Sequence, residues 1–296
     1  MKVEVSRPGK LMFPKDGVTK GDLAGYYERV AEHLLLHSKG RPVSMQRFPD
    51  GIEGYGFFHK DVPDHFPDWV RRVEVAKRGG SVTHAVLWDA DGLVYLADQA
   101  CITPHVWLSR MDRVHQPDRL VIDLDPSVPD FAAVRKAALA AGRLLEELGL
   151  APFAMATGSR GLHVWAPLRR GADYDQVKEF ARGAARVLAA RHPDELTVES
   201  RKAKRGDRIL LDVARNAYAQ TAVPPYAVRA RPGAPVATPL EWKELSDSRL
   251  RPDRWNVKNV FRRLASKGDP WAEMGSQARG LAKPRKRLEA LLREQA

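Results

Sequence analysis

The stretch from Leu120 to Pro126, LVIDLDP, places two carboxylates two residues apart inside an apolar run. On a β-strand, residues i and i+2 point to the same face, so Asp123 and Asp125 would project together. Two carboxylates on one buried strand repel each other, and burial penalises their charged forms. A divalent cation removes both penalties, so the stretch is consistent with a metal site. The alternative is a strand end with two solvated aspartates before a turn, because the Asp-x-Asp pattern is common.

A third carboxylate and a glycine-rich turn follow this pair along the chain. Asp212 lies near the end of the apolar run ILLDV at 209–213, and the turn GSRG at 158–161 carries Arg160, with His163 just beyond it. Such a turn can offer N–H groups, hydroxyls and cations to a phosphate chain, although it can equally be a plain hairpin with a surface arginine. Three carboxylates on apolar strands fit two divalent ions that clamp a phosphoryl transfer. Oxygen ligands favour magnesium or manganese over zinc.

The composition indicates a globular protein with a polyanionic partner. The chain has 296 residues, enough for one large domain or two small ones, and a formal net charge of +12. The cations cluster, with five in the eight residues 201–208 and a dense patch at 283–287. Nucleic acid is the simplest partner for such a charge, although some globular proteins are merely basic.

Cysteine content and hydropathy argue against a secreted protein and against a membrane protein. Cys101 is the only cysteine, which excludes a disulfide framework and a zinc site built from cysteines. The N-terminus lacks the apolar core of a signal peptide, and no run reaches membrane-spanning length. We therefore expect a cytoplasmic, nucleoid-associated protein with no membrane partner.

Two segments of the N-terminal third suggest contacts with nucleic acid. Thr19 is a candidate N-cap with Asp22 in a capping box, and Lys10 and Lys20 flank that helix start. Lysines beside free N–H groups of a helix N-terminus can bind a phosphate, although two surface lysines are more often simply solvated.

Farther along, Phe57 and the adjacent Phe58 cannot both enter one core from a strand, so one of them is available to stack on a base. The alternative places both in a loop folded over the core.

The periodicity predicts a mixed α/β fold. Helices are expected from Thr19 onward, over 131–148 after a capping box at 127–130, over 175–190, and in the tail 251–296. Strands are expected at 42–47, 81–89, 92–97, 120–126, 152–157, 162–168, 196–199, 209–213 and 226–230. Residues 105–108 are expected to open a short helical or loop segment.

Four blocks of the sequence resemble a known family. VIDLDP, ATGSRGLHVWAPL, LLDVARN and RARPGAPVATPLEW resemble the three motifs of the archaeo-eukaryotic primase superfamily, and most of all the polymerase domain of bacterial ligase D or its stand-alone relatives. The resemblance covers nearly the whole chain, including VTKGDLAGYY, GFFHKDVPDHFPDWV and HVWLSR. One motif usually has Ser-Gly-Gly-Lys-Gly, where this chain has Thr157, Ser159 and Arg160 in place of the serine, the second glycine and the lysine. These changes keep the hydroxyl, and they keep the charge with a different geometry.

The resemblance implies a role for each matching position. Asp123, Asp125 and Asp212 would be the metal ligands of nucleotidyl transfer, using two Mn²⁺ or Mg²⁺ ions. The incoming nucleotide would be held by Thr157, Arg160, His163, Arg205 and Arg229. Lys10 and Lys20 would grip the 5′-phosphate of a gap or broken end. Phe57, Phe58 and His105 would contact the DNA near that phosphate.

The resemblance also implies a fold and a function. We expect one primase-polymerase domain, with an N-terminal DNA-binding lobe (about 1–115), a catalytic lobe similar to an RNA-recognition fold (about 116–245), and a basic helical segment (246–296). Such proteins add nucleotides, preferably ribonucleotides, to 3′ ends at gaps and broken ends in non-homologous end joining, with Ku and a DNA ligase as possible partners. No nucleotidylated-lysine motif of a ligase is present. Met1 and the basic tail favour a stand-alone polymerase over an excised domain.

Three alternatives remain open at this point. The chain could be a primase that starts chains without a primer, a metal nuclease, or a non-catalytic module that binds DNA ends and recruits a ligase or Ku. The three aspartates argue against the last, because a module that binds no metal has no use for them.

Overall fold

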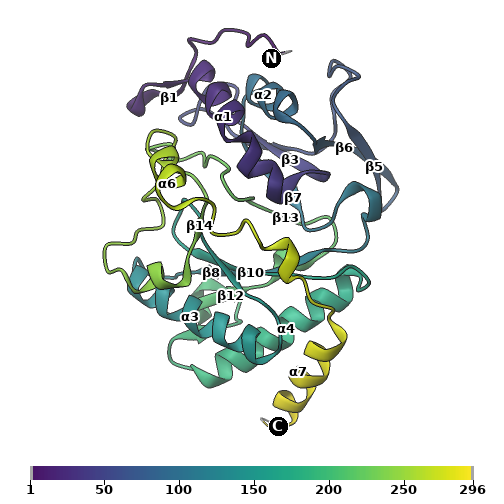
Figure 1. The fold of residues 1–296 in the computed structure, drawn as a ribbon, viewed down its shortest axis with the longest axis vertical. Coiled ribbons are helices and arrows are strands. Elements are labelled where there is room, and N and C mark those ends of the chain that lie inside the picture. Colours follow the sequence, from purple (N-terminus) through teal and green to yellow (C-terminus); the bar gives the residue numbers. More distant parts are fainter. Residues whose placement is uncertain (1–2, 295–296) are drawn as a thin grey trace. The chain divides into compact units, whose positions relative to one another are not determined.

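The structure is a computed structural model that describes residues 3–294, and it divides into two compact units. Unit 1 comprises residues 1–114, 221–237 and 255–268, and unit 2 comprises residues 115–220, 238–254 and 269–296. Each unit combines helices with a six-stranded sheet, as the mixed α/β prediction requires (Figure 1). The expected tail segment 246–296 is shared between the two units.

Unit 1 is built on a largely antiparallel sheet in the order β13-β7-β3-β6-β5, with β4 paired to β3. Helices α1 and α2 pack against each other, and a two-stranded sheet precedes α1. The elements are β1 (Leu11–Phe13), η1 (Pro14–Asp16), β2 (Val18–Thr19), α1 (Lys20–Ser38), β3 (Arg41–Arg47), β4 (Phe57–His59), β5 (Arg72–Lys77), β6 (Gly80–Leu87), α2 (Ala90–Asp98), β7 (Cys101–Trp107), η2 (Met111–Arg113), β13 (Thr221–Ala222) and α6 (Val260–Lys267).

The start of α1 confirms the predicted capping box. The Thr19 hydroxyl accepts a hydrogen bond from the N–H of Asp22, and the Asp22 carboxylate accepts one from the N–H of Thr19. These bonds satisfy helix-end donors that would otherwise have no intrahelical partner. The apolar positions of the helix, including Leu23, Val30 and Leu34, are buried.

Three predictions for unit 1 are wrong. Residues 92–97 belong to helix α2 and not to a strand, because Asp89 caps the helix by accepting a hydrogen bond from Gly92 N–H. A short apolar run cannot distinguish the two structures by periodicity alone. Residues 105–107 belong to strand β7, which pairs with β3 and β13. Residues 226–230 form no strand, since Tyr226 has a φ of 66° and only the isolated bridge between Val228 and Val236 forms there.

Unit 2 is built on a sheet in the order β11-β12-β8-β10-β9-β14, with β8 near its centre. The pairs β12–β8, β8–β10, β10–β9 and β9–β14 are antiparallel, whereas β11 pairs with β12 in parallel. Helices α3 and α4 pack on the sheet (Figure 1). The elements are β8 (Arg119–Asp125), α3 (Phe131–Glu147), β9 (Phe153–Ala156), β10 (Leu162–Pro167), α4 (Tyr174–Arg191), β11 (Leu196–Thr197), α5 (Lys202–Arg205), β12 (Ile209–Asp212), η3 (Ala214–Asn216), β14 (Thr238–Leu240), η4 (Trp242–Ser246), η5 (Gly275–Gln277) and α7 (Ala282–Glu294).

The predicted helices 131–148 and 175–190 and the predicted strands of unit 2 are present with small differences at their ends. The tail is expected to be helical over 251–296, but in the described part of unit 2 it is an α-helix only from Ala282 to Glu294. Helix α3 starts at the predicted residue, but its N-cap is Asp130, whose carboxylate accepts a hydrogen bond from the N–H of Ala133. The hydroxyl of Ser127, which was expected to belong to a capping box, instead donates to the carbonyl of Arg208. Part of the basic loop 201–208 is the short helix α5.

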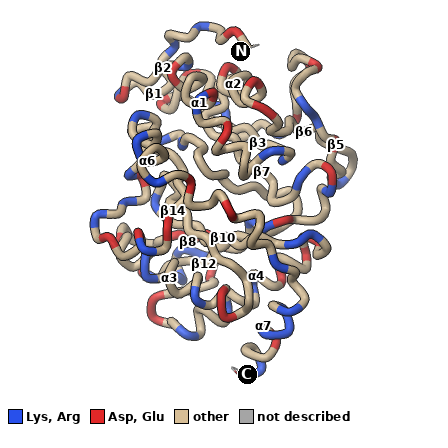
Figure 2. Tube along the Cα trace, viewed as in Figure 1, with Lys and Arg blue, Asp and Glu red and all other residues tan. Residues whose placement is uncertain are grey.

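The basic residues gather on particular helices within each unit. Lys and Arg follow the length of α7 in unit 2 and surround α6 in unit 1 (Figure 2). Within residues 3–294, no helix is both long enough and apolar enough to span a membrane.

The glycine that ends the β9–β10 turn packs directly on strand β8. A Cβ atom at Gly161 would collide with the carbonyl oxygen of Leu124, which is backbone and cannot swing aside. We expect Gly161→Ala to lower the free energy of unfolding by about 1–3 kcal/mol, the usual range for overpacking. Urea unfolding measures this change. Gly275→Ala is the matched control, because a Cβ there meets no atom within 4 Å, and an equal loss in both variants would contradict the prediction.

Candidate active site

The three aspartates lie on two neighbouring strands of unit 2. In the antiparallel pairing of β8 with β12, Asp123 lies directly opposite Asp212, and in the pairing of β8 with β10 it lies opposite His163. Directly opposed residues project from the same face of a sheet, with Cβ atoms about 4.5–5.5 Å apart. Asp125 projects from this face as well, two residues along β8. The expected clustering of Asp123, Asp125 and Asp212 is therefore a consequence of strand register.

Two arginines hold the carboxylate of Asp125. Arg160, from the β9–β10 turn, donates from Nη2 to Oδ1 at 3.0 Å, and Arg205, from α5, donates from Nη1 to Oδ2 at 3.4 Å. Arg205 is buried and also donates to the carbonyls of Glu199 and Ser200, which fixes its guanidinium in place. The side chain of Arg160 is 59% exposed, so it can change its rotamer without disturbing the packing of the core. One arginine is thus a fixed part of the site, and the other is adjustable.

The other two aspartates have different partners. His163 Nε2 lies 3.4 Å from Asp123 Oδ1, and Asp212 Oδ1 accepts a hydrogen bond from the N–H of Ala214 at 2.7 Å. His163 is buried, and its Nδ1 has no hydrogen-bond partner among the residues that the structure describes. Buried polar atoms are nearly always paired, so this nitrogen is one of the few exceptions in the unit.

The side chains would have to turn for the aspartates to share a metal ion. Among residues 3–294, no group of three or more His, Cys, Asp or Glu residues is arranged so that it could hold one. The carboxylate of Asp125 is directed at its two arginines and that of Asp123 at His163. In chemistry the donor set still fits, since carboxylate oxygens suit magnesium or manganese, and in backbone position the three aspartates are adjacent.

The turn between β9 and β10 is fixed by one hydrogen bond within it and one to Pro252. The Thr157 hydroxyl donates to the carbonyl of Gly161 at 2.9 Å, and the N–H of Gly158 donates to the carbonyl of Pro252 at 2.9 Å. Gly158 has a φ of 66°, in the left-handed region that glycine tolerates best. These bonds close the turn and anchor it to the segment at Pro252, and Arg160 in the turn reaches Asp125.

A pocket of about 740 Å³ lies on the other side of Arg160. Its lining includes three arginines, two aspartates, three serines and apolar residues. The arginines are Arg135, Arg160 and Arg251, and the aspartates are Asp130 and Asp253. Its volume is typical of small-molecule sites, and its lining carries one more arginine than aspartates. Arg160 is shared between this pocket and the carboxylates.

Sequence reasoning missed Asn216 as a positioning residue. Its side chain is fully buried, its Oδ1 accepts from the N–H of Val121, and its Nδ2 donates to the carbonyls of Val121 and Val213. These bonds tie β8, two residues before Asp123, to the segment that follows Asp212. The only signal in the sequence is an asparagine four residues after the last aspartate.

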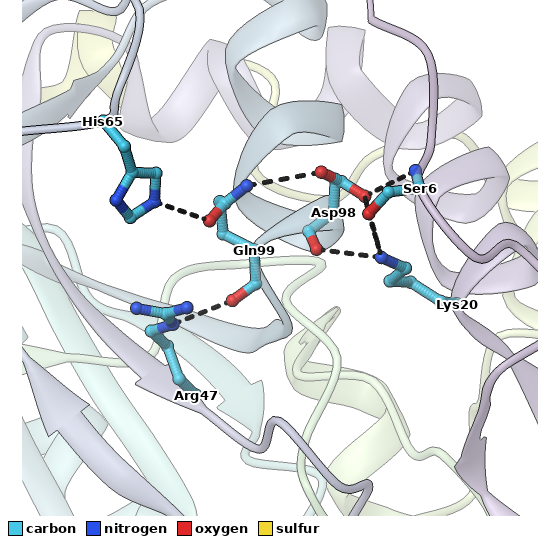
Figure 3. Close-up of polar contacts among 6 residues, drawn as sticks. All are labelled: Ser6, Lys20, Arg47, His65, Asp98 and Gln99. Atoms are coloured by element: carbon cyan, nitrogen blue, oxygen red, sulfur yellow. Dashed lines mark hydrogen bonds and ion pairs between the residues drawn. The ribbon is translucent and has the colours of Figure 1, made fainter. Parts of the chain in front are cut away.

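The lysines predicted to bind phosphate lie in unit 1 and are both ion-paired. Lys10 Nζ lies 3.0 Å from Asp50 Oδ1 at the surface, and Lys20 Nζ lies 2.8 Å from Asp98 Oδ1 with both side chains less than a tenth exposed (Figure 3). The expectation of free N–H groups at the start of α1 is wrong. Those of Lys20 and Gly21 donate to the carbonyls of Lys10 and Pro8, and that of Asp22 is capped.

The predicted aromatic contacts lie on β4 and β7, also in unit 1. Phe58 is 54% exposed while its neighbour Phe57 is less so, as the strand geometry requires. The ring of His105 lies edge-on to Phe58, with ring centroids 5.2 Å apart. Tyr55, which sequence reasoning missed, is 82% exposed and lies nearly parallel to Phe57. Large exposed rings of this kind can stack on nucleobases.

Arg229 is the one predicted nucleotide ligand that belongs to unit 1. Its N–H donates to the carbonyl of Pro235, and the neighbouring carbonyl of Val228 accepts from the hydroxyl of Thr103. The remaining predicted nucleotide ligands, Thr157, Arg160, His163 and Arg205, all belong to unit 2 with the three aspartates.

Adjacent carboxylates can hold the metal ions that stabilise the attacking and leaving oxygens of a nucleotidyl or phosphoryl transfer. Comparison with known proteins makes the class more specific. The family described as "LigD, primase-polymerase domain" matches residues 19–271, and the chain belongs to this family. It is an enzyme of the DNA-directed nucleotidyltransferase class.

Individual relatives agree with this membership. The chain is 34% identical to the multifunctional non-homologous end joining protein LigD of Pseudomonas aeruginosa, over 99% of this chain and 34% of that protein. It is 33% identical to the multifunctional non-homologous end joining DNA repair protein LigD of Mycobacterium tuberculosis, over 90% of this chain and 36% of that protein. It therefore spans about a third of the length of these relatives.

Among solved structures, the polymerase domain of M. tuberculosis ligase D, determined in complex with DNA, matches with a TM-score of 0.88 and 31% sequence identity. The match covers 94% of this chain and 99% of that one. This agreement confirms the predicted fold class.

Proposed function

We propose that the chain is a DNA repair polymerase that adds nucleotides to 3′ ends at gaps or broken ends, in bacterial non-homologous end joining or short-gap filling. The observation that carries the proposal is the convergence of Asp123, Asp125 and Asp212 by strand register, beside Arg160 and Arg205, in a member of the LigD primase-polymerase family. A nuclease of the same metal chemistry has no need for cations placed to hold a triphosphate.

The three aspartates would hold two divalent ions, manganese or magnesium. When bound, such ions stabilise the negative charge on the attacking and leaving oxygens of a nucleotidyl transfer. The protein's own contribution is geometric. Asn216 fixes β8 next to β12, which keeps Asp123 opposite Asp212.

Thr157, Arg160, His163, Arg205 and Arg229 would bind the incoming nucleoside triphosphate. Arg160 and Arg205 now neutralise Asp125. Once cations neutralise that carboxylate, the two guanidiniums are available to phosphate oxygens, which they bind well because of their planar fork of donors. Arg205 would stay where it is, while the exposed Arg160 could follow the phosphates.

The DNA end would be held by unit 1. Lys10 and Lys20 would bind the 5′-phosphate of the downstream strand, and Phe57, Phe58 and His105 would contact the template beside it. The excess of basic residues supports a DNA partner, since lysines and arginines that neutralise phosphates supply much of the affinity of such complexes. Ku and a DNA ligase are the protein partners that the family's role in end joining suggests.

Two other functions are open to test. A de novo primase would make dinucleotides from nucleotides on a single-stranded template, and an end-binding module would bind gapped DNA without extending it. The clustered aspartates disfavour the module, because such clustering is electrostatically unfavourable unless it has a use.

Loss of Asp125 should abolish extension. We expect Asp125→Ala to reduce primer extension on a single-nucleotide gap by well over the ~10–100-fold that loss of a supporting residue around a metal site costs. DNA affinity should stay within about twofold, because the change removes a negative charge and no DNA contact. Chelation of divalent metal from the wild-type protein should have the same effect.

Asp194→Ala is the control for this experiment, since Asp194 is an exposed carboxylate of the same unit. Extension at a normal rate by Asp125→Ala would contradict the proposed catalytic site. An inactive wild-type protein that binds gaps tightly with every divalent metal would favour the end-binding module.

Sugar preference distinguishes a ligase D type of polymerase from an ordinary repair polymerase. We expect faster templated insertion of ribonucleoside than of deoxyribonucleoside triphosphates with manganese, as the family resemblance implies. Single-turnover rates for the two sugars opposite the same template base measure the preference. Equal rates, or faster insertion of deoxyribonucleotides, would refute it.

The lysine pair should matter for 5′-phosphate recognition. We expect the double change Lys10→Ala and Lys20→Ala to lower the preference for a 5′-phosphorylated over a 5′-hydroxyl gap, and to weaken binding to plain duplex less. Lys10→Ala alone should have part of this effect, since the side chain of Lys10 is 29% exposed and its partner Asp50 lies at the surface. Titration by fluorescence anisotropy at several salt concentrations measures both affinities.

Lys15→Ala provides the control, because Lys15 is an exposed lysine of the same segment. An equal loss of affinity for phosphorylated gap and plain duplex would reduce Lys10 and Lys20 to general electrostatic attraction.

A further inference from the structure

The ammonium group of Lys20 is fully occupied within the protein. Its Nζ donates to the Ser6 hydroxyl at 2.8 Å, to the Asp98 carboxylate at 2.8 Å and to the Asp98 carbonyl at 3.2 Å (Figure 3). An ammonium group has three protons to donate, so these three acceptors use all of them. A phosphate can contact Lys20 only if one of these acceptors leaves.

Asp98 is the one acceptor among them that carries a charge. Its Oδ1 accepts from Lys20 and from both the N–H and the hydroxyl of Ser6, and its Oδ2 accepts from the side-chain amide of Gln99. Burial raises the pKa of Asp98, but the hydrogen bonds from Lys20 and Ser6 outweigh it and leave the pKa below its usual value. At neutral pH the carboxylate is therefore an anion in direct contact with the lysine.

We propose that Asp98 is a resident anion at Lys20 that the 5′-phosphate of DNA must replace, so that Asp98 sets how strongly this protein recognises a phosphorylated end. The inference rests on the proposed phosphate role of Lys10 and Lys20. It adds a residue that acts against binding, while the lysines act for it.

The hydrogen bonds around Asp98 make such an exchange feasible. If Lys20 turns to a phosphate, Asp98 keeps the donors of Ser6 and the amide of Gln99, so it is not left buried and unpaired. Gln99 is in turn held by His65 at 3.1 Å and by Arg47, which donates to its carbonyl at 2.8 Å (Figure 3). Ser6 is exposed, so solvent reaches the network from that side.

The network also connects the two predicted DNA contacts of unit 1. Arg47, which binds the Gln99 carbonyl, lies 3.0 Å from His59 Nδ1 and 5.8 Å from the centre of the Phe57 ring. The end of α2 thus lies between the lysine that would meet the 5′-phosphate and the strand that would meet the template. Asp98 is placed where it can affect the first contact while Gln99 supports the second.

The test compares Asp98→Asn with the wild-type protein on a single-nucleotide-gapped duplex that carries either a 5′-phosphate or a 5′-hydroxyl. Asparagine can still accept hydrogen bonds from Ser6 and Lys20 but has no charge with which to compete. We expect the ratio of the two affinities to rise at least about fivefold in favour of phosphate, the lower end of ordinary coupling between binding events. An unchanged ratio would make Asp98 merely structural, and a lower ratio would make it a residue that orients Lys20. Either result overturns the proposal.

Asp68→Asn is the matched control, because it makes the same charge change in the same unit at a fully exposed carboxylate, whose pairing with Arg72 is at the surface. Its affinity ratio should equal that of the wild-type protein. Asp98→Glu, which keeps the charge, should lie nearer to the wild-type protein than Asp98→Asn does.

The wild-type protein offers a second measurement in case Asp98→Asn does not fold. The ¹⁵N resonance of the Lys20 ammonium and the ¹³C resonance of the Asp98 carboxylate should both shift with the phosphorylated gap but not with the hydroxyl gap. Absence of these shifts would also overturn the proposal.

If the lysine changes leave the wild-type phosphate preference intact, the proposed phosphate site fails. If they remove it and Asp98→Asn does not raise it, only the role of Asp98 fails.

Discussion

The close placement of three carboxylates on one face of a buried sheet is the constraint on which unit 2 depends. Because Asp123 lies opposite Asp212 and Asp125 lies two residues along the same strand, mutual repulsion and desolvation would oppose folding if the carboxylates were left alone. The surrounding structure supplies compensation from several elements: Arg160 from a hairpin turn, Arg205 from a short helix, His163 from the neighbouring strand, and the backbone after β12. The turn, the basic segment and the strand order therefore serve one electrostatic requirement.

A similar arrangement occurs in unit 1 with the charges reversed. There the group that would bind ligand is the ammonium of Lys20, and the compensating group is the carboxylate of Asp98. Breaking a buried ion pair by removing one partner is expensive, whereas replacing one partner by another ion of the same sign leaves the remaining charge paired. In both units an internal counter-ion holds the ligand-binding group, and a ligand with the charge of that counter-ion would keep the group paired. In unit 1 the displaced Asp98 would retain the hydrogen bonds from Ser6 and Gln99.

Much of the fold and the carboxylate cluster could be predicted because the signals are local. The i and i+2 spacing of Asp123 and Asp125, the capping box of Thr19 and the strong periodicity of α3 are each contained in a few consecutive residues. The sequence favours a strand where helix α2 forms, because the apolar run is short and Asp89, which caps the helix, lies outside that run. The Lys20–Asp98 pair could not be predicted in this way, because its partners are 78 positions apart and each looks like an ordinary surface charge. Asn216 is similar, since its role depends on Val121, 95 residues earlier.

The difference between local and distant signals also affects how function should be inferred from such a sequence. Motifs identify which residues bind ligand, but the counter-ions that limit binding lie elsewhere in the chain and are found only in the folded structure. Lys20 illustrates the point: the sequence suggests an available cation at a helix start, whereas the structure has an ammonium with every proton donated. Affinity for a charged ligand is the difference between what the ligand offers and what the internal partner already provides. Two proteins with the same motif residues can therefore differ in phosphate affinity through residues that never touch the phosphate.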